Sequence, residues 1–343
     1  MRCKWIGAAL FLPALSVICL PISAATPFGC QMVKIASLPI EVTTTNRVVV
    51  SGSIKGEPAK FLLDTGASWS LSDNAVISHF GVASGIAQAH MYGLGGEFEA
   101  YKATIPDLVV GNLKGGNLMM WVSSTHFLQE GIYGVLGEDF FKNADLDIDL
   151  AHGKFDLFEH YDCKTEPVYW ADKFSEADVI VRNEAGAIPA NRPGAIDRNV
   201  KIFVTVEVNG ISARAILDLG APYTIVSWSL ARRLGLEKAS QGMELIGKVS
   251  GFDRNKMDLF RYRFAEFGIG DEVIRNPLLF VSDLQQRKKD GNSMDHIQDK
   301  TWSEGDILLG TDFIRSHHMF VAADQGKIYF TWNGGSIFLP PKE

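Results

Sequence analysis

The chain has 343 residues, long enough for about two domains of ordinary size. Its composition, 46% apolar and 21% charged, is that of a globular protein, which excludes disorder, collagen and coiled coil. The formal net charge is −7, and the longest basic run is only Arg287-Lys288-Lys289, so we expect no nucleic-acid partner. The four cysteines form neither a disulfide-dense scaffold nor a C-x-x-C zinc or redox motif.

Residues 1–25 are typical of a secretory signal peptide. Arg2 and Lys4 precede an uncharged stretch that ends in the small residues 23–25. An uncleaved anchor, which the prolines within the stretch disfavour, and a lipoprotein processed at Cys30 are the alternatives. We therefore expect cleavage after residue 25, a periplasmic or secreted location, and no membrane contact of the mature chain.

The remaining cysteines fit an oxidising compartment. Removal of the signal peptide leaves only Cys30 and Cys163, and we expect a disulfide between them. Two free buried thiols are the alternative.

The chain contains one unit twice. Residues 48–82 align without a gap on residues 202–236 at a constant offset of 154. The closing segments match again, residues 137–154 with 310–327, at an offset of 173. Two copies of so long a unit indicate a pseudo-symmetric pair of domains rather than a solenoid.

The repeat sets the expected boundaries. We place an N-terminal lobe at residues 26–160 and a C-terminal lobe at residues 200–343. Prolines and turn residues interrupt the pattern at 161–199, which we interpret as a linker. The polar stretch 284–305 has no counterpart in the first unit and is expected to form an exposed loop.

Periodicity within each unit favours short strands. The β-branched runs 48–50 and 202–208 end at the turn signals Gly56 and Asn209-Gly210, which are typical of hairpins. A short helix is predicted at 229–234. The fold is therefore expected to be mostly β.

An acidic turn follows an apolar run in both units. Asp64-Thr65-Gly66 follows residues 61–63, and Asp218-Leu219-Gly220 follows residues 215–217. An aspartate at the end of a buried strand is costly unless it is hydrogen-bonded, so two of them at matching positions indicate function.

These motifs resemble the aspartic proteases of the retropepsin-like and pepsin-like class, with two lobes fused in one exported chain as in bacterial aspartyl proteases. Residues 135–137 and 308–310 are similar to the apolar-apolar-Gly element that braces each catalytic loop. The resemblance covers nearly all of the mature chain. It implies two pseudo-symmetric β-barrel lobes with an active-site cleft between them.

The resemblance also assigns roles to residues. Asp64 and Asp218 would be the catalytic pair. Support of the catalytic loops is assigned to Thr65, Gly66, Ala67, Ser68, Leu219, Gly220 and Ala221. Substrate-covering flaps are implied at Gly93, Leu94, Gly95 and Gly96 in the first lobe, and at Gly247 and Gly251 in the second.

The chemistry of two adjacent carboxyl groups agrees with this resemblance. The two carboxyl groups of such a pair cannot both be ionised at once, so the pair holds one proton and titrates as a unit. The ionised member can take a proton from water while the protonated member donates to the substrate carbonyl. We expect an aspartic endopeptidase acting on peptides or unfolded proteins as a monomer, with no cofactor and no metal. Glycines at 66 and 220 would let the opposite lobe approach closely.

One position departs from the family. Leu219 has no hydroxyl where Thr65 has one, so the symmetric cross-lobe brace is incomplete. A catalytically inactive peptide-binding or protein-binding descendant is therefore the alternative function. A β-rich envelope or carbohydrate-binding domain is a third hypothesis, against which the repeated acidic turn argues.

Two further motifs are interpreted structurally. The alternating aspartates of 145–149 resemble half of a calcium loop, but Leu150 replaces the required glycine, and an edge strand fits better. His317 and His318 are adjacent and have no third ligand at a usable spacing, which disfavours a metal site.

Overall fold

The computed structural model describes residues 32–93, 96–160, 165–183, 200–250, 256–284 and 305–338. Several expectations lie outside these residues: the signal peptide 1–25, Cys30 and Cys163, flap residues Leu94, Gly95 and Gly251, and most of the loop at 284–305. They stay predictions.

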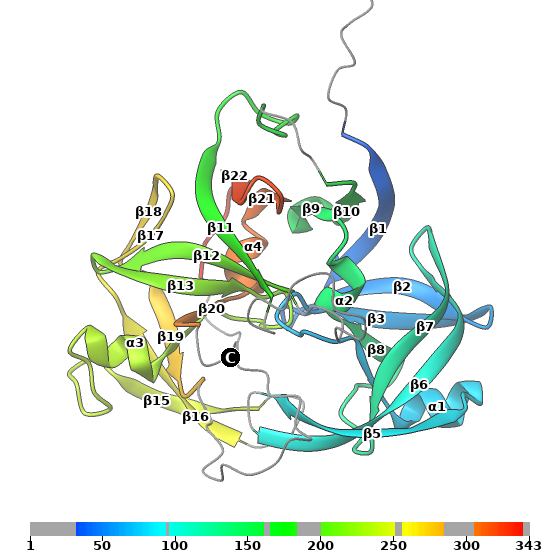
Figure 1. Ribbon diagram of the computed structural model, residues 1–343. Coiled ribbons are helices and arrows are strands. Elements are labelled where there is room, and N and C mark those ends of the chain that lie inside the picture. The colour runs from blue at the N-terminus through cyan, green and yellow to red at the C-terminus, as the bar shows by residue number, and fades with distance from the viewer. Residues whose placement is uncertain are drawn as a thin grey trace, which may run out of the picture. The chain divides into compact units, whose positions relative to one another are not determined.

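The described residues of the first lobe form ten strands, two short helices and one 3₁₀ turn, and Figure 1 shows their arrangement. In chain order these are β1 (Lys34–Val42), β2 (Val48–Ile54), β3 (Glu57–Leu63), β4 (Leu71–Asp73), α1 (Asn74–Phe80), β5 (Ser84–Gly93), β6 (Gly96–Val110), β7 (Leu113–Ser123), β8 (Ile132–Leu136), α2 (Glu138–Phe141), β9 (Asp145–Asp149), η1 (Leu150–His152) and β10 (Lys154–Phe158).

The second lobe has a similar order of described elements. It comprises β11 (Ser175–Asn183), β12 (Val200–Val208), β13 (Ile211–Leu217), β14 (Ile225–Ser227), α3 (Trp228–Arg233), β15 (Glu244–Ser250), β16 (Lys256–Arg263), β17 (Glu266–Ile269), β18 (Glu272–Arg275), β19 (Leu278–Ser282), β20 (Ile307–Leu309), α4 (Thr311–Ile314), β21 (His317–Ala322) and β22 (Lys327–Trp332). Four strands, β16 to β19, stand where the first lobe has β6 and β7, and no 3₁₀ turn precedes the last strand of the second lobe. The expectation of a mostly β chain with two pseudo-symmetric lobes is confirmed.

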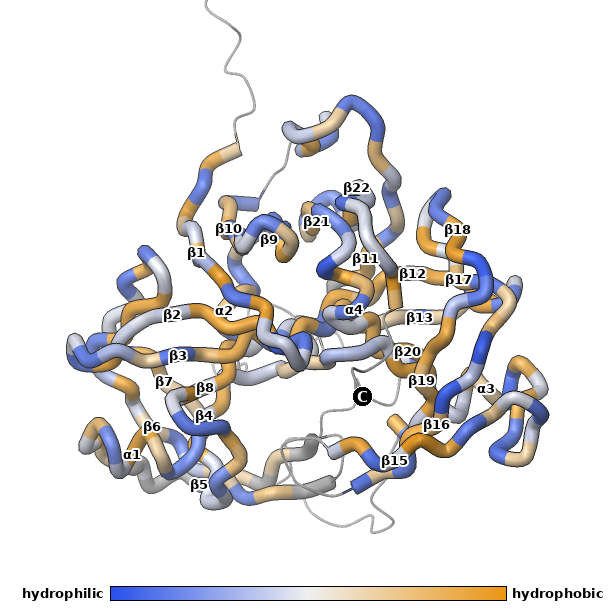
Figure 2. The backbone as a smooth tube through the Cα atoms, turned by 180° about the vertical axis from the view of Figure 1, so that it is seen from behind, coloured by the Kyte–Doolittle hydropathy of each residue, from blue (hydrophilic) through white to orange (hydrophobic). Residues whose placement is uncertain are grey.

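Strand pairing closes the first lobe into a six-stranded barrel, in the order β2-β3-β8-β4-β7-β6. In the second lobe the strands pair in the order β18-β17-β12-β13-β20-β14-β19-β16-β15. Apolar segments of these strands appear orange in Figure 2, for example along β19, whose last four residues are buried.

The predicted hairpin turns form as expected. Lys55 and Gly56 join β2 to β3 with φ of 52° and 81°, and Asn209 and Gly210 join β12 to β13 with φ of 49° and 75°. Positive φ at both central residues matches the right-handed twist of the strands, and asparagine and glycine adopt it at little cost.

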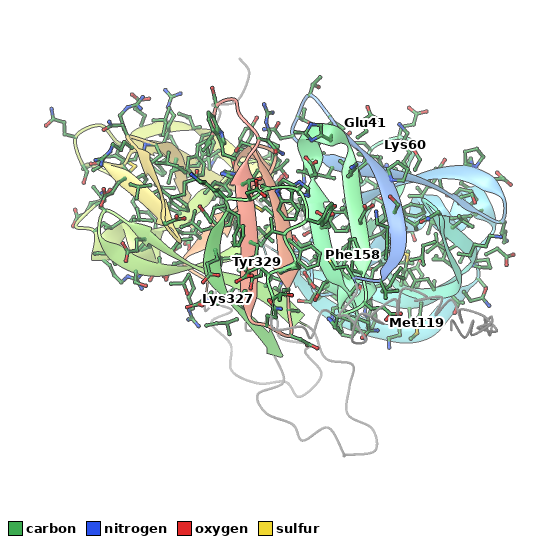
Figure 3. The ribbon with its side chains drawn as sticks, turned by 90° about the horizontal axis from the view of Figure 1, so that it is seen from above. Glu41, Lys60, Met119, Phe158, Lys327 and Tyr329 are labelled. Carbon is green, nitrogen blue, oxygen red and sulfur yellow. The ribbon has the colours of Figure 1, made fainter. Side chains whose placement is uncertain are left out.

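A third sheet joins the lobes. Its six antiparallel strands run β1-β10-β9-β21-β22-β11, so each lobe contributes three of them. Phe158 of β10 and Tyr329 of β22, both labelled in Figure 3, belong to one buried cluster on this sheet.

This shared sheet corrects two sequence-based interpretations. Strand β11 lies inside the stretch 161–199 assigned to the linker, where Ala177 and Val179 alternate with exposed residues and are buried. Strand β9 pairs on both sides, with β10 and β21, so the expectation of an edge strand at 145–149 is wrong. Its aspartates are buried because hydrogen bonds satisfy them, for example His318 Nε2 at 2.6 Å from Asp147 Oδ1.

Candidate active site

The two acidic turns occupy equivalent places in the lobes. Strand β3 runs into Asp64 and strand β13 into Asp218, and each is paired in parallel with the strand that braces it, β8 or β20. The Asp64 N–H donates to Leu136 O at 3.0 Å, and the Asp218 N–H donates to Leu309 O at 2.9 Å. The predicted apolar-apolar-Gly elements therefore hold the backbone of both aspartates.

The carboxyl groups of Asp64 and Asp218 meet across the lobes. They are hydrogen-bonded to each other and are 6% and 4% exposed. Asp64 Oδ1 accepts from the Ala67 N–H at 2.8 Å. Asp218 Oδ1 accepts from the N–H groups of Gly220 and Ala221 at 2.8 and 3.1 Å. The turns thus fix both side chains at the point of contact.

The glycines of the two motifs make this approach possible. A Cβ atom on Gly66 would lie 2.4 Å from Asp218 Cγ, and one on Gly220 would lie 2.2 Å from Asp64 Cγ. Real Cβ atoms do not come this close, so each lobe needs glycine where it faces the carboxyl group of the other.

Burial is the main cause of the electrostatic state of the pair. It raises the pKa of Asp64 above its usual value, while the charges of Lys201 and Arg47 and a hydrogen bond from Asp218 oppose this. Burial, followed by the negative charge of Asp64, raises the pKa of Asp218 to about 8. The pair therefore holds a shared proton, and its two carboxyl groups titrate as a unit.

Of the two equivalent motif residues, Thr65 and Leu219, only Thr65 has a hydroxyl group, and this group forms hydrogen bonds to the other lobe. Its Oγ1 donates to Leu217 O at 2.6 Å and accepts from the Leu219 N–H at 3.0 Å. Leu219 itself is fully buried and packs in the main hydrophobic core. Apolar packing therefore occupies the place of the second hydroxyl.

A second layer of hydrogen bonds supports each acidic turn in the same way. In the first lobe Ser70 Oγ donates to Asp139 at 2.7 Å and accepts from the Gly137 N–H at 3.1 Å. In the second, Thr224 Oγ1 donates to Asp312 at 2.7 Å and accepts from the Gly310 N–H at 3.0 Å. The repeat is thus preserved in the contacts as well as in the sequence.

The remaining loop-support residues lie beside the pair. The carbonyl of Ala67 accepts from the Glu138 N–H and that of Ala221 from the Thr311 N–H, both at 2.8 Å. These bonds join the acidic turns to helices α2 and α4. Ser68 is buried in the same turn as Ala67.

Three of the implied flap residues, Gly93, Gly96 and Gly247, lie in described strands. Gly93 and Gly96 pair with each other at the ends of β5 and β6. Gly247 lies in β15, with φ of 152°, next to an irregularity in the pairing of β15 with β16.

Three residues at the site were not predicted from the sequence. Arg47 Nη1 donates to Gly220 O at 2.6 Å, and Lys201 Nζ donates to Gly66 O. Glu138 is 2% exposed, and burial raises its pKa well above the usual value. Charged side chains are normally solvent-exposed. These three residues also belong to no sequence motif with a characteristic spacing, so the sequence did not indicate that they lie at the site.

The described part of the chain has neither a cluster of metal ligands nor a membrane-spanning helix. No three His, Cys, Asp or Glu side chains there converge as metal ligands would. No helix of that part has the length and apolarity needed to cross a membrane.

Comparison with known proteins places the chain in a family. A structural similarity to the aspartic proteinase of Irpex lacteus covers 87% of this chain and 97% of that one, with a TM-score of 0.47 at 12% identity. No curated protein matches the chain. The family model described as aspartyl protease matches residues 50–140 and 204–313, more than half of the chain and one segment in each lobe. The chain therefore belongs to the aspartyl protease family.

Proposed function

We propose that the protein is an aspartic endopeptidase whose catalytic pair is Asp64 and Asp218. The observation that carries the proposal is the buried, hydrogen-bonded contact between these two carboxyl groups, each facing a glycine of the opposite lobe. Burying two acids against each other opposes folding unless they share a proton, so their presence at matching positions has a chemical rather than a structural explanation.

The roles follow from the two environments. Asp218, whose pKa is raised by burial and by the negative charge of Asp64, holds the proton and donates it to the carbonyl oxygen of the peptide. Asp64, near the positive charges of Lys201 and Arg47, is the ionised member and takes a proton from the attacking water. The water oxygen adds to the carbonyl carbon. Asp64 then gives its proton to the amide nitrogen as the C–N bond breaks, and Asp218 takes back a proton from the hydroxyl group that becomes the carbonyl oxygen of the acid product. No covalent enzyme intermediate is formed.

The substrates proposed are peptides or unfolded proteins, cleaved by a monomer outside the cytoplasm. This location rests on the signal-like residues 1–25. The inactive peptide-binding alternative rests on Leu219, and the intact brace at Thr65 weakens it.

Digestion of denatured casein tests the proposal. Wild type should cleave it, and Asp64→Asn and Asp218→Asn should each abolish cleavage while keeping the thermal melting profile. Asp271→Asn, on the exposed β17–β18 turn, is the matched control and should retain full activity. A wild type that binds casein peptides without cleaving them at any pH would establish the inactive binder instead.

A further inference from the structure

Arg47 and Lys201 are equivalent residues of the two lobes. They are related by the offset of 154 that also relates Gly66 to Gly220. Arg47 precedes β2 and donates to the carbonyl of Gly220 in the second lobe. Lys201 lies at the start of β12 and donates to the carbonyl of Gly66 in the first lobe. Each lobe therefore extends a cationic side chain to the catalytic turn of the other.

The two cations differ in burial. Arg47 is half-buried, whereas Lys201 has an exposed fraction of 0%. A fully buried ammonium group opposes folding unless negative charge lies close to it. Within the described part of the chain, the ionisable groups whose charges interact at this place are Asp64, Asp218, Glu138, Asp139 and Arg47.

Glu138 does not supply the compensating charge. It lies in α2 with its Oε1 unpaired among the described residues, and burial favours its neutral form. The positive charge that acts on Asp139 is that of Lys142 rather than that of Lys201. Among the described residues, the negative charge that compensates Lys201 is therefore the single charge of the Asp64–Asp218 pair.

We propose that Lys201 is a positioning residue that keeps the aspartate pair singly ionised, by pairing its buried ammonium group with the charge of the pair and by fixing the Gly66 carbonyl from the opposite lobe. This role rests on the proposed peptidase function, because the singly ionised pair is the form that activates water. Leu219 leaves the first lobe without a hydroxyl brace from the second, and the bond from Lys201 to Gly66 supplies a cross-lobe contact to the same turn.

The direction of the effect follows from the charge. Lys201 lowers the pKa of Asp64 and of Asp218, while burial raises both. Replacing Lys201 with a neutral side chain should therefore move both limbs of the pH–activity profile to higher pH. A nearby opposite charge lowers the pKa of a carboxyl group by about 1–3 units, so we expect each limb to shift by about that much.

The first experiment is the pH profile of kcat/KM for Lys201→Met, Lys201→Arg and the control Lys60→Met, which removes a half-exposed lysine paired with Glu41. Lys201→Met should shift both limbs upward. Lys201→Arg should return them toward the wild-type positions, and Lys60→Met should leave them in place. A loss of kcat at every pH with unmoved limbs would show a merely structural role and overturn the proposal.

A second measurement does not depend on turnover or on the folding of the Lys201 variants. In wild type labelled with ¹³C in aspartate and ¹⁵N in lysine, the Cγ signals of the pair and the Nζ signal of Lys201 should titrate with common midpoints. Asp64→Asn and Asp218→Asn assign the Cγ signals. If the Nζ chemical shift does not change as the pair titrates, the proposed role of Lys201 is overturned. Common midpoints in a protein that never cleaves casein would instead overturn the peptidase function and leave the pairing standing.

Discussion

The Thr65 hydroxyl accepts a hydrogen bond from the backbone N–H of Leu219, the residue that takes its own place in the second lobe. The same hydroxyl donates to the carbonyl of Leu217, so one side chain holds the backbone on both sides of Asp218. Leu219 has no group with which to return the contact. The cross-lobe brace is therefore asymmetric and depends on a single threonine.

Thr65→Val should remove this brace while keeping the shape of the side chain. The carbonyl of Leu217 and the N–H of Leu219 would lose their partner in a buried place, at about 1–3 kcal/mol for each group. Urea unfolding should show the loss in the free energy of unfolding, and casein cleavage should fall with it. Thr65→Ser keeps the hydroxyl and is the control. Equal stability of the Val and Ser variants would contradict the prediction.

Gly220→Ala should abolish activity. The new Cβ would lie 2.2 Å from Asp64 Cγ, so one of the two catalytic turns must move away from the other. Gly115→Ala is the matched control, because its Cβ would meet only Leu108 O at 3.6 Å, an ordinary contact. The measurement is casein cleavage at equal concentrations of folded protein. Substantial activity in Gly220→Ala would show that the carboxyl groups need not be in contact.

The sequence was sufficient to predict the contact between the aspartates but not the charges around it. Asp64 and Asp218 could be found because a short motif follows an apolar strand twice, and local sequence determines such a turn. Lys201 and Glu138 could not, because their burial depends on how the lobes meet. Only the offset of 154, extended by one residue beyond Val48 and Ile202, could have drawn attention to Arg47 and Lys201.

The shared sheet explains the other differences. Strand β11 has few local sequence signals because its two halves pair with different strands. Residues 175–178 pair with β22 and residues 179–183 with β12, and these two partners are far apart in the chain. The aspartates of β9 lie in a central strand of the sheet. Alternating charged residues are more typical of an edge strand, so the sequence pattern favoured the wrong position. Both cases depend on long-range pairing that short-range periodicity does not record.

Peptidase activity should extend to near-neutral pH. The two limbs of kcat/KM reflect the two apparent pKa values of the pair. Burial raises the pKa of both members, that of Asp218 to about 8. An internally quenched peptide assayed from about pH 3 to 9 measures both limbs. We expect activity at pH 6–7 and its loss above about pH 8. An alkaline limb at or below about pH 5 would contradict the raised pKa of Asp218.

Asp312 should make the protein less stable as the pH rises. Burial raises its pKa from 3.8 to about 6, so between these values the folded state binds a proton that the unfolded state has lost. The free energy of unfolding therefore falls as the pH rises through this window, by up to about 3 kcal/mol. Asp312→Asn keeps an oxygen for the hydrogen bonds from Thr224 and Phe313 and removes the titration.

Urea unfolding of both proteins at a series of pH values tests this. Wild type and Asp312→Asn should be similar near pH 4 and should diverge up to about pH 6, with the variant more stable at the higher value. Asp258→Asn gives the opposite sign, because Lys248 lowers the pKa of Asp258 and its ionised form favours the folded state. A stability difference between wild type and Asp312→Asn that stays constant across the window would mean that Asp312 remains ionised in the folded protein, held by the hydroxyl of Thr224.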